Sequence, residues 1–180
     1  IFGFGRAPQQ PFGSSSPTAS AFARDVPVLF FSRRIGLSQG QSVPVIAGAR
    51  VTGKTGPFDV ALLNIQTADK PSAGAVATNF SAVRVKRDVF RRSSIGIIAT
   101  ERLPSAGGGD SNLAVGADAS LRVSDDVTII GYYARTSSAK RTGDNSSYRG
   151  RFDYAADRYG LAFEHLMVGD QFNPAIGFVR

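Results

Sequence analysis

The stretch that decides the fold reads NLAVGADASLRV and covers residues 112–123. Every second position is apolar, from Leu113 to Val123, and the positions between them carry small, polar or charged side chains. Successive side chains of a β-strand point to opposite faces of its sheet, so this strict period of two predicts a strand with one apolar and one polar face. Such a strand fits between lipid and a polar lumen, and it fits equally well in a half-buried soluble sheet.

Segments of the same kind follow one another along most of the chain, with almost no helical stretch. We expect strands at residues 28–33, 45–54, 58–68, 79–87, 93–101, 112–123, 126–137, 146–155 and 158–168. The last two alternate cleanly, with Arg149, Arg151 and Asp153 opposite an aromatic face. Segments 58–68 and 126–137 alternate less regularly, and the pattern does not assign their faces.

The connections between these segments alternate in length. Short connections are expected near residues 55–57, 88–92, 124–126 and 155–157, and long ones near residues 69–78, 102–111 and 137–146. Successive connections of an up-and-down meander lie at opposite ends, and outer-membrane barrels have short turns at one end and long loops at the other. A Greek-key sandwich does not sort its connections in this way. The sequence therefore predicts an all-β fold, an antiparallel up-and-down meander of about eight to ten strands that is part of a transmembrane β-barrel.

Composition removes several other classes of protein. The chain has 180 residues, of which 42% are hydrophobic, with no cysteine and a net charge of +7. Its longest apolar runs fall far short of the ~18 residues that a transmembrane helix needs. The lack of cysteine excludes a disulfide scaffold, a thiol nucleophile and a zinc–thiolate site. The positive charge suits a solvated surface, lipopolysaccharide phosphates or an anion-attracting pore. No nucleic-acid partner is expected, because few aromatic residues accompany the basic ones.

Two regions differ in composition. Residues 1–27 are rich in glycine, proline and serine and predict an extended segment. Residues 28–180 predict the barrel portion. The chain ends in Gly177-Phe178-Val179-Arg180, without the terminal aromatic residue of a finished barrel, so we expect an incomplete barrel and an interior piece of a longer protein.

One motif looks catalytic. Residues 48–55 read GARVTGKT and match the phosphate-binding loop G-x-x-x-x-G-K-[ST]. That loop needs a helix beginning at its Lys-Thr pair, but Gly56 and Pro57 follow here. The preferred interpretation is a hairpin, with strand 45–54, a turn, and strand 58–68. A nucleotide site is the alternative.

The charged residues suggest what the polar face contains. The densest basic stretch includes Arg87, Arg91 and Arg92, and it is expected to form a positive turn at the membrane rim, or else to line a pore or bind phosphates. The residues expected to face the lumen are Arg84, Lys86, Asp118, Ser120, Arg122, Arg151, Asp153 and Glu164.

No catalytic residue is predicted. The acids Asp118, Asp153 and Glu164 share the polar face, which leaves a glycosidase-like carboxylate pair open as an alternative. His165 is the only histidine and is expected on the apolar face, too isolated for a metal site or a serine triad. No metal and no cofactor are predicted.

Several motifs carry a family resemblance. They are LFFSRRIGL at residues 29–37, VPVIAGARVTGKTG at 43–56, ALLNIQT at 61–67, NFSAVRVKRD at 79–88, SYRG at 147–150, EH at 164–165 and VGDQFNPAIGF at 168–178. Together they resemble a large bacterial family of uncharacterised proteins. Its members pair an N-terminal domain like the family-9 carbohydrate-binding modules with a long C-terminal domain of unknown function that looks like an outer-membrane barrel. The resemblance spans residues 30–180 and implies no catalytic residues. No part of the sequence resembles the sugar-binding-like domain of the family.

Residues and resemblance together predict an outer-membrane β-barrel without enzymatic activity. It would pass small solutes or glycans, or anchor a glycan-binding domain, in the bacterial outer membrane. The expected partners are outer-membrane lipid, glycans and other protein chains. One alternative is a structural scaffold whose sheet edges pair with other chains of an assembly. Another is an enzyme that binds a nucleotide or hydrolyses glycans.

Overall fold

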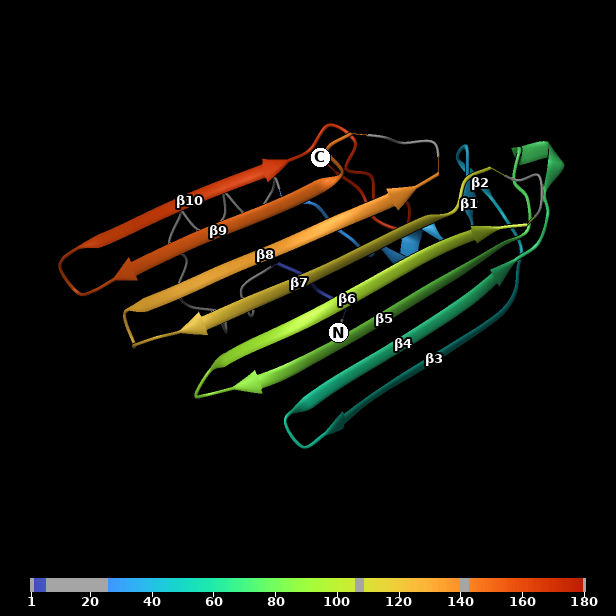
Figure 1. The fold of residues 1–180 in the computed structure, drawn as a ribbon. Coiled ribbons are helices and arrows are strands. Elements are labelled where there is room, and N and C mark those ends of the chain that lie inside the picture. The colour runs from blue at the N-terminus through green and yellow to red at the C-terminus, as the bar shows by residue number, and fades with distance from the viewer. Residues whose placement is uncertain (1, 6–25, 106–108, 140–142, 180) are drawn as a thin grey trace.

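The described residues form one large antiparallel sheet. The computed structural model describes residues 2–5, 26–105, 109–139 and 143–179. The eight strands of the sheet follow the chain, each paired with its neighbours in sequence, and the sheet does not close (Figure 1). They are β3 (Val45–Thr55), β4 (Phe58–Thr67), β5 (Thr78–Val89), β6 (Ser93–Pro104), β7 (Asn112–Arg122), β8 (Val127–Ser138), β9 (Ser146–Ala155) and β10 (Gly160–Val168). The prediction of an all-β up-and-down meander is confirmed.

Small elements flank the sheet. A two-stranded ribbon pairs β1 (Leu37–Ser38) with β2 (Gln41–Ser42), and two 3-10 turns are η1 (Ser32–Arg34) and η2 (Pro71–Ala73). No helix among the described residues is long and apolar enough to cross a membrane. Most of the predicted extended segment 1–27 lies outside the described residues.

The predicted strand at 28–33 is wrong. Val28 forms an isolated antiparallel bridge with Phe178, through backbone hydrogen bonds of 2.9 and 2.8 Å, and the chain then enters η1. Leu29 is 1% exposed because it packs on a face of the large sheet. The apolar run thus serves burial on the sheet and does not extend the sheet.

Connection lengths alternate as predicted. The short turns are residues 56–57, 90–92, 123–126 and 156–159, and they lie at one end of the sheet (Figure 1). The long connections are residues 68–77, 105–111 and 139–145, at the opposite end. The first short turn is tight because Gly56 adopts a φ of 55°, which glycine tolerates without steric cost. We call the two ends the short-turn end and the long-loop end.

The two faces of the sheet differ in chemistry. One face, here called the outer face, carries large apolar side chains that remain exposed on every strand. They are Val51, Leu62, Val83, Ile95, Ile97, Leu113, Val115, Ile129, Tyr133, Tyr148, Tyr154, Leu161 and Phe163. The opposite face, the inner face, carries charged, hydroxyl and small residues together with buried apolar ones such as Ile98 and Ile130. The predicted alternation in strands 112–123 and 146–155 is confirmed.

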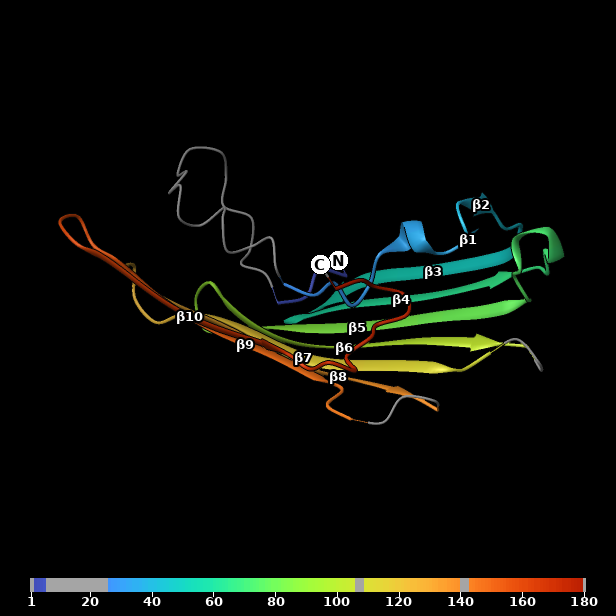
Figure 2. The ribbon, with the colours of Figure 1, turned by 90° about the horizontal axis from the view of Figure 1, so that it is seen from above.

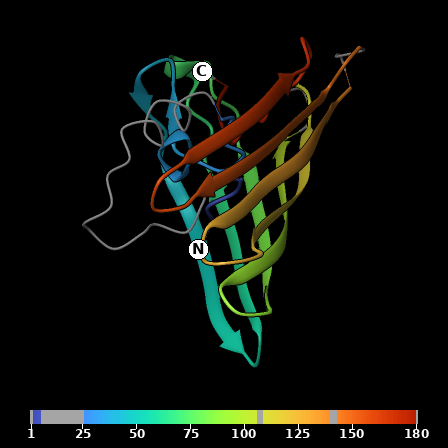
Figure 3. The ribbon, with the colours of Figure 1, turned by 90° about the vertical axis from the view of Figure 1, so that its left-hand side faces the viewer.

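The hydrophobic core lies on the inner face, beneath the terminal segments. Phe4, Leu29 and Phe172 pack with residues of β6, β7 and β8, among them Ile98 and Ala134. Figure 2 shows both chain ends on the same side of the sheet. Figure 3 shows how strongly the sheet twists, with β10 and β3 running in different directions. The core is therefore formed by a small plug and not by a second layer of sheet.

Polar side chains hold the C-terminal part of this plug. The Asn112 side chain donates to the Asn173 carbonyl and accepts from the Ala175 N–H, both at 2.9 Å. The Thr136 hydroxyl accepts from the Asn173 N–H at 3.1 Å. In the last long connection, hydrogen bonds from the hydroxyl and N–H of Ser146 lower the pKa of the Asp144 carboxyl. The bonds made by Asn112 and Thr136 fix residues 173–175 to β7 and β8.

Gly116 makes room for the plug. A Cβ placed there would lie 2.5 Å from Phe4 Cζ and 3.0 Å from Leu29 Cδ1, whereas a Cβ at Gly150 on the outer face would meet nothing within 4 Å. We expect Gly116→Val to lower the free energy of unfolding by about 1–3 kcal/mol through overpacking. Gly150→Val, the matched control on the other face, should change it by less than about 0.5 kcal/mol. Urea titration measures both, and equal effects would contradict this packing.

Candidate functional site: the charged inner face

The register brings all eight predicted lumen-facing residues to the inner face. Lys86 lies opposite Gly96, which lies opposite Asp118, so these positions share a row across β5, β6 and β7. A second row runs across β7 to β10: Ser120 lies opposite Ile130, Ile130 lies opposite Arg151, and Arg151 lies opposite Glu164. The remaining three are Arg84, Arg122 and Asp153, which lie on the same face two positions away in their strands. The inner face is therefore the candidate functional surface.

One buried ion pair crosses three strands. The Arg84 guanidinium on β5 donates to both carboxylate oxygens of Asp118 on β7, at 2.5 and 2.9 Å, and its side chain is 3% exposed. It passes over Gly96 of β6, where a Cβ would lie 2.8 Å from Arg84 Nη2. The Phe4 ring covers the guanidinium at 5.7 Å. A glycine in the middle strand is thus a steric requirement of this pair.

A second charged cluster links β9 and β10. Arg149 Nε lies 2.7 Å from a Glu164 oxygen, and Arg149 Nη1 donates to the Gly5 carbonyl at 3.4 Å. Arg151 binds both Asp153 oxygens, at 2.5 and 2.6 Å, and reaches Glu164 at 3.4 Å. Two arginines thus face two carboxylates, and the cluster carries no net formal charge.

These pairings decide what the charges can do. Asp118, Asp153 and Glu164 are each held by an arginine, so their carboxylates are already neutralised by neighbours. Burying such pairs fixes the geometry of the inner face more than it adds stability, because desolvation offsets much of the Coulomb gain. No group of three or more histidine, aspartate or glutamate residues in the described parts of the chain is arranged to hold a metal.

The other predicted residues lie nearer the short-turn end. Ser120 is buried, whereas Lys86 is half-buried. Arg122 donates its backbone N–H to the Ser93 hydroxyl at 3.0 Å and its Nη2 to the Asp125 carbonyl at 2.9 Å. Its Nε is buried and has no hydrogen-bond partner in the structure. The Nε of Arg84 is likewise buried without a hydrogen-bond partner among the described residues, so two of the eight predicted residues have an unused donor.

The phosphate-loop motif is a strand. Residues 48–55 belong to β3, every residue of which is exposed, and the chain turns at 56–57 into β4. No helix begins at Lys54; its Nζ bonds to an Asp88 oxygen at 3.1 Å. The hairpin interpretation is confirmed.

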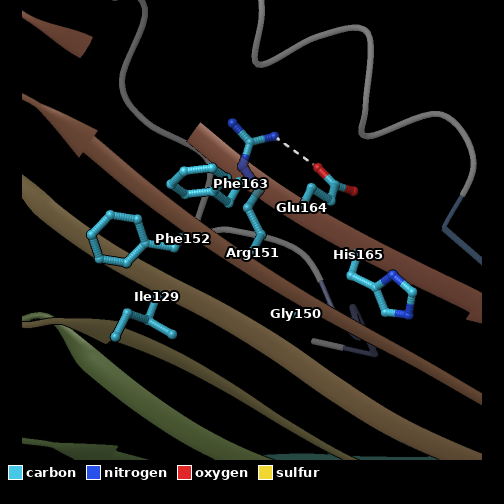
Figure 4. Close-up of a pocket in the computed structure, with 7 residues that line it drawn as sticks. All are labelled: Ile129, Gly150, Arg151, Phe152, Phe163, Glu164 and His165. Carbon is cyan, nitrogen blue, oxygen red and sulfur yellow. Dashed lines mark hydrogen bonds and ion pairs between the residues drawn. The ribbon is translucent and has the colours of Figure 1, made fainter. Parts of the chain in front are cut away.

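A hollow of about 440 Å³ lies across the last three strands (Figure 4). Its lining combines outer-face rings with the Arg151–Glu164 pair, and Gly150 leaves its centre without a side chain. The full lining is Ile129, Gly150, Arg151, Phe152, Phe163, Glu164 and His165. At its edge His165 Nε2 lies 3.3 Å from the Tyr148 hydroxyl. The hollow is thus largely apolar, and His165 lies on the apolar face as the sequence indicates.

Two contributors to the inner face are not among the eight residues expected to face the lumen, although the alternation of 146–155 already places one of them, Arg149, on the polar face. Arg149, 6% exposed, shares the parity of Arg151 in its strand, so alternation alone places it there. Tyr132, also 6% exposed, bonds the Ser147 hydroxyl at 3.0 Å, while the adjacent Tyr133 lies on the outer face. Adjacent residues of a strand face opposite ways, but the irregular pattern of 126–137 did not indicate which of the two tyrosines faces inward.

Comparisons of the chain with family models, with curated proteins and with solved structures find no match. The fold and the inner face define an open antiparallel meander with an exposed apolar face and a polar face covered by the chain's own ends.

The Arg84–Asp118 pair supports a test of the inner face. Asp118→Ala leaves a buried guanidinium without a counter-charge and should cost about 3–5 kcal/mol of unfolding free energy. Adding Arg84→Met removes the orphaned charge and should restore much of that loss. Asp125→Ala, which breaks an exposed pair, should leave stability close to wild type. A double variant as unstable as Asp118→Ala would show that the pair is not the cause.

Proposed function

We propose that this sheet is part of the wall of a transmembrane β-barrel in a bacterial outer membrane. The outer face would contact lipid, and the charged inner face would line the lumen. One observation carries the proposal: large apolar side chains stay exposed on the outer face of all eight strands, while the polar face is the covered one.

The free energy of solvation supports this orientation. A soluble sheet buries its apolar face, because each Å² of apolar surface removed from water contributes about 25 cal/mol. Soluble monomers seldom expose contiguous apolar patches above a few hundred Å². Ile97, Val115 and Phe163 are 59%, 43% and 62% exposed on strands β6, β7 and β10 of one continuous face. Acyl chains are the occupant that such a face suits.

Strand length and aromatic placement agree with a bilayer. The eight strands have 9 to 12 residues, near the ~9–11 that a tilted strand needs to cross. Aromatic side chains gather at the short-turn end, namely Phe58, Phe90, Tyr154 and Tyr159. Aromatic girdles of this kind mark the interface of membrane barrels, whose short turns lie on the periplasmic side.

The inner face bears on what the barrel does. Within this proposal the barrel passes small solutes or glycans, or anchors a glycan-binding domain. The terminal segments pack on the middle of the inner face, and the ion pairs beneath them are neutral. A lined and partly filled lumen favours anchoring, or passage through a restricted path, over a wide anion channel.

The open edges favour a second candidate function. Among the described residues, β3 and β10 each lack a strand partner on one side, and β3 is exposed along its whole length. Unpaired edge strands offer backbone donors and acceptors to another strand. A scaffold that pairs these edges with other chains of an assembly satisfies them, as does a barrel closed by further strands.

Substitution by arginine at two depths tests the lipid contact. Ile97 lies near the middle of β6 and Leu103 near its end, and both are exposed on the outer face. In vesicles, Ile97→Arg should cost about 2–4 kcal/mol of folding free energy and Leu103→Arg about 0–1 kcal/mol, because the penalty for a charge falls toward the interface. Urea titration of the vesicle-folded chain measures both.

In water an exposed isoleucine tolerates arginine with little loss of stability. Equal and small effects at positions 97 and 103 would therefore contradict the membrane proposal. They would leave the scaffold as the better explanation of the exposed face.

A further inference from the structure

An open hollow lies between two neighbouring short turns, and its lining residues are not explained by the packing of the sheet. It has a volume of about 650 Å³ and lies between turn 90–92, which joins β5 to β6, and turn 123–126, which joins β7 to β8. We call it the rim hollow. Its lining residues are Arg91, Arg92, Arg122, Val123, Ser124 and Asp125.

The rim hollow is positively charged. Three guanidinium groups line it and one carboxylate opposes them. The pair between Arg92 and Asp125 is 3.6 Å long and well exposed, so it neutralises little. Arg91 makes no ion pair with any residue that the structure describes. In contrast to the neutral clusters of the inner face, this site keeps a net positive charge.

Arg122 adds a donor that the protein does not use. Its Nη2 is held by the Asp125 carbonyl, while its Nε is buried with no acceptor in the part of the chain that the structure describes. Buried donors are nearly always paired, so each exception needs an explanation such as a water molecule or an ion. Arg84 Nε and Thr100 Oγ1 are the other unpaired buried atoms among the described residues, and of the three only Arg122 lines the rim hollow. An anion in the hollow that Arg122 lines can supply that acceptor.

The turn beside the hollow is strained. Phe90 and Arg92 have φ values of 52° and 61°, although neither is glycine. Such left-handed residues cost free energy and gather at functional sites. Phe90 is 93% exposed, so its aromatic ring faces solvent next to Arg91 and Arg92. A ring with adjacent cations is the composition expected at a membrane–water interface.

We propose that the rim hollow binds the phosphate of an anionic phospholipid head group. Guanidinium groups bind phosphate oxygens through paired, charge-assisted hydrogen bonds, and three arginines line the hollow. Phe90 enters the interface next to the bound head group. This inference rests on the proposed membrane function, and it adds a lipid site at the short-turn end of the sheet.

The test measures binding of dihexanoylphosphatidylglycerol to the full chain in a non-ionic detergent by calorimetry. The variant Arg91→Gln/Arg92→Gln removes two exposed cations from the hollow, so folding is not at stake. The control Arg87→Gln/Arg158→Gln removes the same charge from exposed positions outside it. We expect the first to weaken binding about tenfold or more and the control to stay within about twofold, since charge-assisted contacts are local.

Two further arms identify the source of the phosphate and separate the two proposals. Inorganic phosphate should bind at least about tenfold more weakly than the lipid; equal affinity would assign the site to free phosphate and overturn the lipid assignment. Equal losses in both double variants, or no loss in either, would also overturn it. Insertion of the wild-type chain into phosphatidylcholine vesicles is scored separately. Insertion without selective lipid binding defeats only this inference, whereas failure to insert defeats the membrane function and the lipid source with it.

Discussion

The polarity of the two sheet faces is the constraint on which the rest of the structure depends. Each strand alternates, and the continuous register from β3 to β10 keeps the outer-face residues of one strand beside those of the next. A slip of one residue in any pair would exchange the faces of that strand. The apolar face is therefore a collective property of eight strands, and it is the face that the chain's own ends leave uncovered.

A polar inner face has to satisfy its own charges. Arg84 does so by reaching Asp118 across the missing side chain of Gly96, and Phe4 enters the space left at Gly116. Glycine positions on β6 and β7 thus decide where the sheet can bury a charge or accept the terminal segments. The rim hollow differs because its arginines outnumber the nearby carboxylates. The pairing of charges separates the residues that hold the inner face together from the arginines of the proposed lipid site.

Much of the sheet could be predicted from local patterns. Period-two alternation and turn residues such as Gly56 located the eight strands and the order of short and long connections, because both signals lie within a few residues. The strand predicted at 28–33 is not present. Local patterns could not show that Val28 instead forms a single bridge with Phe178, which is remote in sequence. Parity placed the charged residues on one face, but their pairing depends on register: Arg84 and Asp118 are 34 residues apart. Without that register, the sequence does not show that Arg84 has to pass over Gly96 to reach Asp118.

The proposed lipid contact of the outer face can be tested directly because the chain contains no tryptophan. Ala117→Trp on the outer face and Lys86→Trp on the inner face introduce single emitters at nearly the same depth, one row apart. In vesicles with brominated acyl chains, the account predicts strong quenching at position 117 and weak quenching at position 86. Equal quenching at both positions, or none at position 117, would contradict it.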